Sequence, residues 1–384
     1  MHIVIAPQSL KGSLTAAEAG LAIADGVRAV YPQAEVDIVP VADGGEGTVQ
    51  ALVDATGGKV IEQVVTGPLN TPVQAFFGLL GDGRTAAIEM AASSGLPLVP
   101  IAQRDPRITT TYGVGELILA ALERGCRHFI IGIGGSATND GGAGMAQALG
   151  ASLLDSAGST IPQGGAALAK LAHIALETMD ARLAECTVEV ACDVNNPICG
   201  PSGASAIYGP QKGATPEMVQ QLDAALAHYA EIIERDLGQT VRDIPGAGAA
   251  GGLGAGLIAF LHASLRPGAQ IILDAVQLEE HIRTADMVIT AEGQLDSQTA
   301  YGKSVGAVAA LAKRYELPVL ALAGGLGQDY QAVYALGVDA VAVLPSSPMA
   351  LSYAMEHAAH LTSDATERAL RLIRVGTQLK KTGR

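Results

Sequence analysis

The sequence has no tryptophan, and aromatic residues make up only 3% of its 384 positions. Positive charge is also scarce, since 24 lysines and arginines stand against 38 aspartates and glutamates. The formal net charge of -14 argues against nucleic acid and anionic membrane surfaces as partners, because both are bound through clustered Lys and Arg. We expect small-molecule partners instead, and the composition leaves a homo-oligomer open.

Cysteine is rare as well, with four residues at 126, 186, 192 and 199 and no C-x-x-C pair among them. This pattern favours reduced thiols in a cytosol over a disulfide framework or a redox motif. A zinc site made by Cys186, Cys192 and Cys199 stays a minor alternative, because their spacing differs from that of structural zinc sites.

Long apolar runs are missing too, and none approaches the roughly 18 uninterrupted residues of a membrane helix. The opening segment MHIVIAPQSLKG has no basic stretch, and its apolar run is too short for a signal peptide. We therefore expect a cytoplasmic protein.

The residues that are abundant point to an α/β fold. Apolar residues make up 49% of the chain and glycine occurs 47 times, often directly after Val/Ile-rich runs. Such runs are typical of buried parallel strands joined to helices by tight turns. The length is sufficient for two domains, each with its own core.

Strand and helix patterns alternate at both ends of the chain. Residues 2–6 and 35–39 resemble strands, separated by a helix that a capping box of Thr15 and Glu18 opens. The alternation returns from residue 286 onward, with three strand patterns and a final amphipathic helix. Between them, strand patterns with little helix indicate a mixed sheet, at residues 59–66, 73–80 and 85–90.

These patterns predict a discontinuous α/β architecture. Residues 1–67 and 286–384 would form one doubly wound parallel-sheet domain, because neither end alone supplies enough strands. Residues 68–285 would form an inserted α/β domain with a mixed sheet, which a surface loop tolerates. Ligands of open α/β sheets bind beyond the carboxyl ends of the strands, so the expected site is a cleft between that edge and the insertion.

Two segments contain dinucleotide-type glycine fingerprints. In HFIIGIGGSATNDGG the matching residues are Gly132, Gly134 and Ala137, after a strand pattern. We favour another role there, because Asp140 would repel a pyrophosphate and no second crossover unit follows. In GAGAAGGLGAG, at 246–256, no convincing strand precedes the glycines, so an anion site and close helix packing remain equal alternatives.

A third glycine loop contains the sequence GKS at 302–304. It is no Walker A loop, because Ser297 stands where the leading glycine belongs. Lys303 either contacts a phosphate at the start of a helix or is a solvated lysine.

Acids and a few lysines recur in glycine-flanked loops. Acids that can hold Mg²⁺ and lysines that neutralise phosphate are the two requirements of phosphoryl transfer. Asp193 follows an apolar strand beside Asn195, where a carboxylate can act as a general base toward a hydroxyl; turn chemistry is the other explanation. The residues concerned are Asp43, Glu46, Asp140, Asp193 and Asp296, with Lys11, Lys212 and Lys303.

The whole chain resembles the bacterial glycerate kinases, which phosphorylate D-glycerate at its 2-hydroxyl. The segments that carry the resemblance are IVIAPQSLKGSLTA, VADGGEGTVQALV, IGIGGSATNDGGAGMAQALGA, ACDVNNPICGPSGAS, YGPQKGATPEM, GAGAAGGLGAGL and EGQLDSQTAYGK. The resemblance implies a flavodoxin-like domain interrupted by a second α/β domain similar to restriction endonucleases. It also implies ATP as phosphoryl donor, Mg²⁺ as cofactor and 2-phosphoglycerate as product.

On this basis we expect three groups of site residues. The catalytic residues would be Asp193 and Lys11, and the metal would be held by Asp43 and Asp296. Substrate or phosphate would be bound by Ser9, Ser136, Thr138, Asn139, Asp140, Asn195, Gln211, Lys212 and Lys303.

The chain departs from the family pattern at a few positions. Gln8 stands where aspartate is usual, Gln294 where arginine is usual, and Ser304 begins a stretch without the frequent proline. Loss of the arginine removes a bidentate clamp for carboxylate or phosphate, which bears on substrate preference. Two other functions stay open at this point: an NAD-linked hydroxy-acid dehydrogenase, and a non-catalytic sugar-acid-binding protein of the same fold.

Overall fold

The structure is a computed structural model that describes residues 1–296 and 304–382, without the side chains of the last four. The chain forms two compact units. Unit 1 consists of Met1–Asp43, Asp54–Thr56 and Ala269–Arg384, so it contains both ends of the chain. Unit 2 consists of Gly44–Val53 and Gly57–Gly268.

Unit 1 is built on a five-stranded parallel sheet in the order β13-β12-β11-β1-β2. Numbered along unit 1 alone, this order is 2-1-3-4-5, the flavodoxin-like arrangement. In the register, Ile5 of β1 lies opposite Ile289 on one side and Ile38 on the other. The strands are β1 (His2–Pro7), β2 (Glu35–Ile38), β11 (Met287–Leu295), β12 (Val319–Leu326) and β13 (Ala340–Val343).

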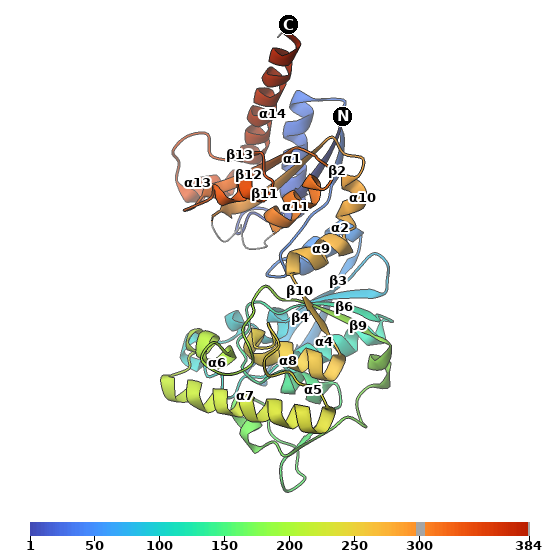
Figure 1. The fold of residues 1–384 in the computed structure, drawn as a ribbon, viewed down its shortest axis with the longest axis vertical. Coiled ribbons are helices and arrows are strands. Elements are labelled where there is room, and N and C mark those ends of the chain that lie inside the picture. The colour runs from blue at the N-terminus through green and yellow to red at the C-terminus, as the bar shows by residue number, and fades with distance from the viewer. Residues whose placement is uncertain (297–303, 383–384) are drawn as a thin grey trace. The chain divides into compact units, whose positions relative to one another are not determined.

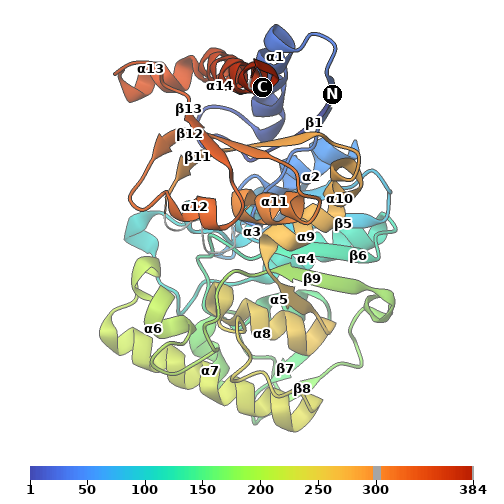
Figure 2. The ribbon, with the colours of Figure 1, turned by 45° about the horizontal axis from the view of Figure 1, so that its top comes forward.

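Helices cover both faces of this sheet, as a doubly wound fold requires. Figure 2 shows α1, α13 and α14 on one side of β11–β13, and α11 and α12 on the other. Among the described residues, no helix combines the length and the apolar character needed to cross a membrane. The helices are α1 (Ala16–Val30), α10 (Leu278–Ile282), α11 (Ser304–Lys313), α12 (Ala332–Ala335), α13 (Leu351–Glu356) and α14 (Ala358–Thr382), while α2 (Thr48–Thr56) and α9 (Gly268–Ala275) lie at the limits between the units.

Alternate strand residues of unit 1 fill two apolar layers. Ile3, Ile5 and Ile289 belong to one core cluster together with buried residues of α1 and α14. Val4 and Val288, which alternate with them, are also fully buried. Burial on both faces explains why these strands are continuous apolar runs in the sequence.

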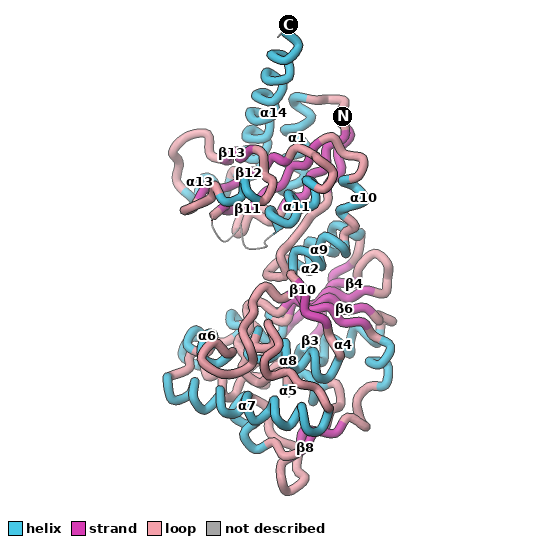
Figure 3. The backbone as a smooth tube through the Cα atoms, in the orientation of Figure 1, coloured by secondary structure: helices cyan, strands magenta, loops and turns pink. Residues whose placement is uncertain are grey.

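Unit 2 contains a six-stranded mixed sheet in the order β10-β9-β6-β5-β4-β3. Its four strands β10, β9, β6 and β5 are parallel, whereas β3 and β4 add an antiparallel hairpin at one edge. The tube in Figure 3 shows these strands beside the helices and long loops of the unit. The strands are β3 (Lys59–Thr66), β4 (Pro72–Leu79), β5 (Thr85–Glu89), β6 (His128–Gly132), β9 (Thr187–Ala191) and β10 (Ser264–Arg266), with β7 (Ser152–Leu154) and β8 (His173–Ala175) in a separate two-stranded sheet.

The helices of unit 2 bury a second apolar cluster, separate from that of unit 1. Figure 1 shows α7, the long helix that lies along this unit near α5 and α8. The helices are α3 (Ala91–Ser94), α4 (Tyr112–Glu123), α5 (Ala143–Ala148), α6 (Ala204–Tyr208), α7 (Pro216–Leu237) and α8 (Ala249–Leu261), with 3₁₀ turns η1 (Leu96–Leu98), η2 (Ile101–Gln103), η3 (Gly165–Lys170), η4 (Ala181–Glu185) and η5 (Pro210–Lys212).

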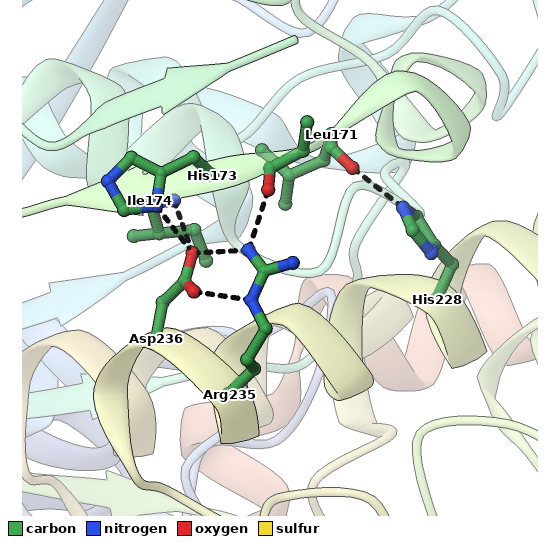
Figure 4. Close-up of polar contacts among 7 residues, drawn as sticks. Leu171, His173, Ile174, His228, Arg235 and Asp236 are labelled. Atoms are coloured by element: carbon green, nitrogen blue, oxygen red, sulfur yellow. Dashed lines mark hydrogen bonds and ion pairs between the residues drawn. The ribbon is translucent and has the colours of Figure 1, made fainter. Parts of the chain in front are cut away.

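The carboxyl-terminal half of α7 is fixed to the two-stranded sheet by polar contacts (Figure 4). Asp236 Oδ2 accepts hydrogen bonds from the Ile174 N–H at 2.8 Å and from Arg235 Nη2 at 2.9 Å, and His173 Nδ1 lies 2.9 Å from it. The hydrogen-bonded Arg235 guanidinium lowers the pKa of Asp236 to about 2, so this carboxylate stays charged at neutral pH. About two turns earlier in α7, His228 Nε2 lies 2.7 Å from the Leu171 carbonyl oxygen.

The predicted fold class is confirmed, and most predicted elements are present. The capping box forms as expected: Thr15 N–H donates to Glu18 Oε2 at 2.8 Å, and Glu18 N–H donates to Thr15 Oγ1 at 3.2 Å. The limits of the units differ from the predicted domains 1–67 with 286–384 and 68–285. Strand β3 belongs to unit 2 because it pairs with β4, and residues 269–285 belong to unit 1.

Whether the units fold independently stays a prediction that fragments can test. Residues 44–268 contain the whole six-stranded sheet and its core, so this fragment should unfold in one cooperative thermal transition. Residues 269–384 contain β11–β13 but lack β1, and the exposed edge of β11 should leave this fragment unfolded or aggregated. Circular dichroism during heating shows whether each fragment unfolds in a cooperative transition. A cooperative transition in fragment 269–384 would show that unit 1 does not need both chain ends.

Candidate functional site

The carboxyl edge of the unit 1 sheet has its switch point between β1 and β11. Helices leave the sheet in opposite directions on either side of this point, and ligands of flavodoxin-like folds bind there. The Gln8 N–H donates to the Ala291 carbonyl at 2.8 Å and continues the pairing of the strands into the loop. The Gln8 side chain is buried, and within the described residues its Oε1 has no hydrogen-bond partner. Gln8, one of the residues that depart from the family pattern, therefore lies at the switch point.

Several predicted site residues lie along this same edge. Ser9 is half-buried and Lys11 is exposed in the loop after β1. Asp43 follows β2 and Asp296 follows β11, the two strands that flank β1, and both are half-buried. The structure thus places these four residues in unit 1, beyond the carboxyl ends of three adjacent strands.

In unit 2, Asp193 lies beyond the carboxyl end of β9. Its Oδ1 accepts a hydrogen bond of 2.9 Å from the Gly268 N–H, which follows the neighbouring strand β10. The Asp193 side chain is nevertheless exposed, as is that of Asn195. The neighbouring Asn196 stabilises this turn, because its side-chain oxygen Oδ1 accepts a hydrogen bond of 2.7 Å from the Tyr208 hydroxyl. Asp193 is thus an oriented and accessible carboxylate.

Glu89 at the end of β5 has a role that the sequence patterns did not predict. This buried carboxylate accepts a hydrogen bond of 2.8 Å from the Val49 N–H at the start of α2, and burial raises its pKa. The preceding loop approaches the adjacent strand so closely that a Cβ on Gly132 would lie 2.5 Å from the Gly44 carbonyl oxygen. In the sequence, Glu89 is visible only as an acid at the end of an apolar strand. Its partner, the Val49 N–H, lies 40 residues earlier, so no local pattern indicates the contact.

The loop that contains Ser136 and Asp140 is held from inside unit 2. Thr138, Asn139 and Asp140 have no exposed surface. Asp140 Oδ2 accepts hydrogen bonds from the Thr111 N–H at 2.8 Å and from the Thr111 hydroxyl at 2.9 Å. The amides of Gly142 and Gly144 contribute longer bonds of 3.2 Å to the same carboxylate. Burial raises the pKa of Asp140 despite these donors.

Lys212 extends into the same interior. Its side chain is almost completely buried, and Nζ donates to Ser136 Oγ at 2.8 Å and to the Thr138 carbonyl at 2.6 Å. Burial lowers the pKa of Lys212 to about 7, although the Asp140 carboxylate opposes the shift. The lysine anchors the loop from inside, while its neighbour Gln211 is exposed.

These contacts do not support direct ligand binding by four predicted residues. The side chains of Thr138, Asn139, Asp140 and Lys212 are enclosed by the protein, so we assign them to positioning of the loop. Ser136, which is 8% exposed, keeps slight access to the surface. Lys303 lies outside the described residues.

The glycines of segment 246–256 serve close packing. A Cβ on Gly251 would lie 2.0 Å from the Thr138 carbonyl oxygen, and one on Gly256 would lie 2.5 Å from the Gly141 carbonyl oxygen. All residues from Gly246 to Leu257 are buried. This observation decides between the two alternatives left by the sequence, because α8 lies directly against the 138–142 backbone.

The chain's own carboxylates occupy three helix amino-termini that follow strands. Glu18 caps α1, Glu89 binds the first turn of α2, and Asp140 binds the first turn of α5. Each carboxylate uses the N–H groups that would otherwise attract an anion. At α5 the Asp140 carboxylate occupies the amides that a pyrophosphate would need, which argues against a pyrophosphate site at the glycine fingerprint of 132–137.

The four cysteines are free thiols, and burial raises the pKa of each of them. Among residues 1–296 and 304–382, no group of three or more His, Cys, Asp or Glu side chains forms a metal-binding cluster.

The fold is that of an α/β protein whose predicted polar loop residues follow the carboxyl ends of strands. The family model described as "Glycerate kinase family" matches residues 3–374. The chain belongs to the glycerate kinase family, as its sequence motifs predicted, and it is accordingly an enzyme, a phosphotransferase of this kind. Membership of a kinase family also implies a nucleotide as the phosphoryl donor.

Relatives support this assignment over nearly the whole length. The chain is 55% identical over 382 residues to the glycerate kinase of Bacillus subtilis (strain 168), covering 100% of this chain and 99% of the relative. It is 54% identical over 341 residues to the glycerate 2-kinase of Escherichia coli (strain K12), covering 89% and 90%. A crystal structure of a glycerate kinase 2 from Salmonella typhimurium LT2 matches with a TM-score of 0.92 and 52% identity, covering 98% of this chain and 99% of that one.

The buried ammonium of Lys212 should make stability depend on pH. A lysine with its folded pKa lowered to about 7 binds fewer protons than the unfolded chain between that pH and its ordinary pKa. The free energy of unfolding should therefore rise with pH above about 7, by up to about 1.4 kcal/mol per pH unit. In Lys212→Met this rise should be absent.

Urea unfolding of both proteins between about pH 7 and pH 9.5 measures the difference. An exposed lysine, changed in Lys170→Met, serves as control and should leave the pH dependence unchanged. Parallel curves for wild type and Lys212→Met would contradict the assignment of Lys212 as a buried anchor.

Proposed function

We propose that the chain transfers the γ-phosphoryl group of ATP to the 2-hydroxyl of D-glycerate, which yields 2-phosphoglycerate and ADP. The observation that carries the proposal is the 54% identity to a protein named glycerate 2-kinase, over 89% of this chain. The accessible, oriented carboxylate of Asp193 supports it, because hydroxyl phosphorylation needs an acceptor for the hydroxyl proton.

In this reaction the glycerate hydroxyl oxygen forms a bond to the γ-phosphorus, and the bond from that phosphorus to the β,γ-bridging oxygen breaks. Asp193 accepts or orients the hydroxyl proton. Its Oδ1 is held by the Gly268 N–H, so the carboxylate is positioned before the substrate binds. Asn195, exposed two residues later, is our candidate for a hydrogen bond to the substrate.

The phosphate charge needs local compensation in a chain of net charge -14. Lys11 supplies an exposed cation directly after the switch-point strand, and Ser9 supplies a hydroxyl beside it. We therefore propose that the loop after β1 contacts the donor phosphates. Gln211 and Ser136 remain proposed contacts in unit 2, because one is exposed and the other is only slightly accessible.

Asp43 and Asp296 have the donor chemistry that Mg²⁺ requires. Mg²⁺ commonly takes one or two protein carboxylates and completes its shell with water and substrate phosphates, so a larger protein cluster is not needed. When bound, the ion would neutralise charge that develops on the phosphate oxygens. The expectation that substrate binds in a cleft between the two domains stays a prediction.

A coupled ADP-release assay with D-glycerate, with and without Mg²⁺, tests the proposed function, and ³¹P NMR of the product locates the phosphate. Mg²⁺-dependent ADP release with phosphate at the 2-position is the expected outcome. Phosphate at the 3-position would contradict the regiochemistry. Glycerate-dependent reduction of NAD without ADP release would favour the dehydrogenase alternative. Binding of glycerate without turnover would favour a sugar-acid-binding protein.

Asp193→Asn should lower kcat by about 10²–10⁴-fold, because a positioned base contributes about that factor. The amide oxygen can still accept from the Gly268 N–H, so the turn should persist. Steady-state kinetics give the rate, and thermal unfolding shows whether the fold survives. Retention of more than roughly a third of the wild-type kcat in a folded variant would leave Asp193 as a turn residue only.

Lys11→Ala should weaken catalysis through loss of phosphate neutralisation. We expect KM for ATP to rise, or kcat to fall, by at least about tenfold, which corresponds to about 1.4 kcal/mol. Lys59→Ala, at an exposed lysine of β3, is the matched control and should leave both parameters unchanged. Equal kinetics for the two variants would remove Lys11 from the site.

A further inference from the structure

Unit 1 contains an apolar cavity of about 290 Å³ at the carboxyl edge of its sheet. This volume is close to the lower end of the range of small-molecule pockets, roughly 300–1,000 Å³. Leu10 and Lys11 line it from the loop after β1, and Leu344 lines it from the segment after β13. Helix α13 contributes Leu351 and Met355.

Two glycines present bare backbone to this cavity. Gly293 of β11 and Gly324 of β12 both line it, and they lie next to each other in the register of the two strands. A Cβ on Gly324 would lie 2.6 Å from the Gly293 carbonyl oxygen, so a side chain at Gly324 would clash with the backbone of β11. A planar ring fits such a surface better than a branched aliphatic chain does.

The opposite side of the cavity is apolar and adaptable. Leu361 is buried, whereas Leu351 is 75% exposed and Met355 is 36% exposed. Met355 also contacts the loop after β1, because a Cβ on Gly12 would lie 2.7 Å from its Cε. A flexible methionine and an exposed leucine can close against a ligand face without rearrangement of the sheet.

The polar feature that suits a charged ligand is Lys11. Its side chain is exposed, and within the described residues it has no ion-pair partner. An apolar slot with a cation beside it matches a molecule that is planar and apolar at one end and anionic at the other. Glycerate has no such apolar part, whereas a nucleoside triphosphate has both parts.

We propose that this cavity binds the base of the nucleotide donor against the Gly293–Gly324 backbone, with the phosphates directed toward Lys11. The inference rests on the proposed function, because it takes the donor to be a purine nucleotide. It adds a location for the base within unit 1 and assigns α13 as the helix that covers it.

Ala354→Phe tests the proposal, because Ala354 lines the cavity and a benzyl group there would fill it. We expect the Kd of ADP, measured by calorimetry, and the KM for ATP to rise at least about tenfold. The KM for D-glycerate should change less than about twofold. Ser352→Phe adds the same ring to an exposed position of α13 outside the lining and should leave the three constants unchanged.

Three outcomes would overturn the inference. One is an unchanged ADP Kd in folded Ala354→Phe while the wild type phosphorylates glycerate, which leaves the proposed function intact. Another is that the wild type does not bind ADP. If the wild type also fails to phosphorylate glycerate, the proposed function is rejected as well. The last is a changed oligomeric state in light scattering with unchanged ADP binding, which would make the cavity an interface between copies. If Ala354→Phe does not fold, Leu351→Ser, at a largely exposed position, replaces it with an expected rise in ADP Kd of about threefold or more.

Discussion

Unit 1 depends on the pairing of β1 with β11, two strands that lie more than 280 residues apart in the sequence. Five residue pairs align in parallel, from Ile3 with Met287 to Pro7 with Ala291. The buried Thr290 hydroxyl adds a hydrogen bond of 2.8 Å to the Ala6 carbonyl. Because β1 also carries β2, removal of this pairing would divide the five-stranded sheet into two pieces. The same pairing creates the switch point. It therefore positions the loop with Ser9 and Lys11, and also Gly293 of β11, which lines the apolar cavity.

Glycine-rich loops in this chain perform different tasks that look alike in the sequence. The glycines of 246–256 let a helix approach the backbone at 138–142. Those of 132–142 permit a turn that the buried Asp140 carboxylate closes through amide hydrogen bonds. Gly293 and Gly324 instead leave open backbone at a cavity. The glycines of 246–256 and 132–142 lie against other segments of the chain, whereas Gly293 and Gly324 also line a cavity.

Buried charge in unit 2 is used to position loops. Glu89 and Asp140 each bind the amino-terminal turn of a helix, and Lys212 joins the loop of Ser136 to its own segment. Charged groups that are buried and well hydrogen-bonded strongly favour one loop conformation, because any other conformation leaves a charge without partners. The accessible Asp193 accepts a hydrogen bond from the Gly268 backbone amide, which orients its carboxylate. Rigid loops around an accessible acid are the arrangement expected for catalysis that depends on orientation.

The fold class, the family and the local elements could all be predicted from the amino-acid sequence. The Thr15–Glu18 capping box, the strand at 59–66 and the alternation that returns near residue 286 are set by short-range pattern, so they could be predicted. The sequence also indicated Asp193 and Lys11, which follow strand patterns, as candidate catalytic residues. The three-dimensional structure was needed to show that Lys212, Thr138 and Asp140 face the interior and that Glu89 binds the start of α2. Burial and long-range hydrogen bonds depend on segments tens of residues away in the sequence. A local pattern therefore cannot predict which side of a loop the rest of the chain will cover.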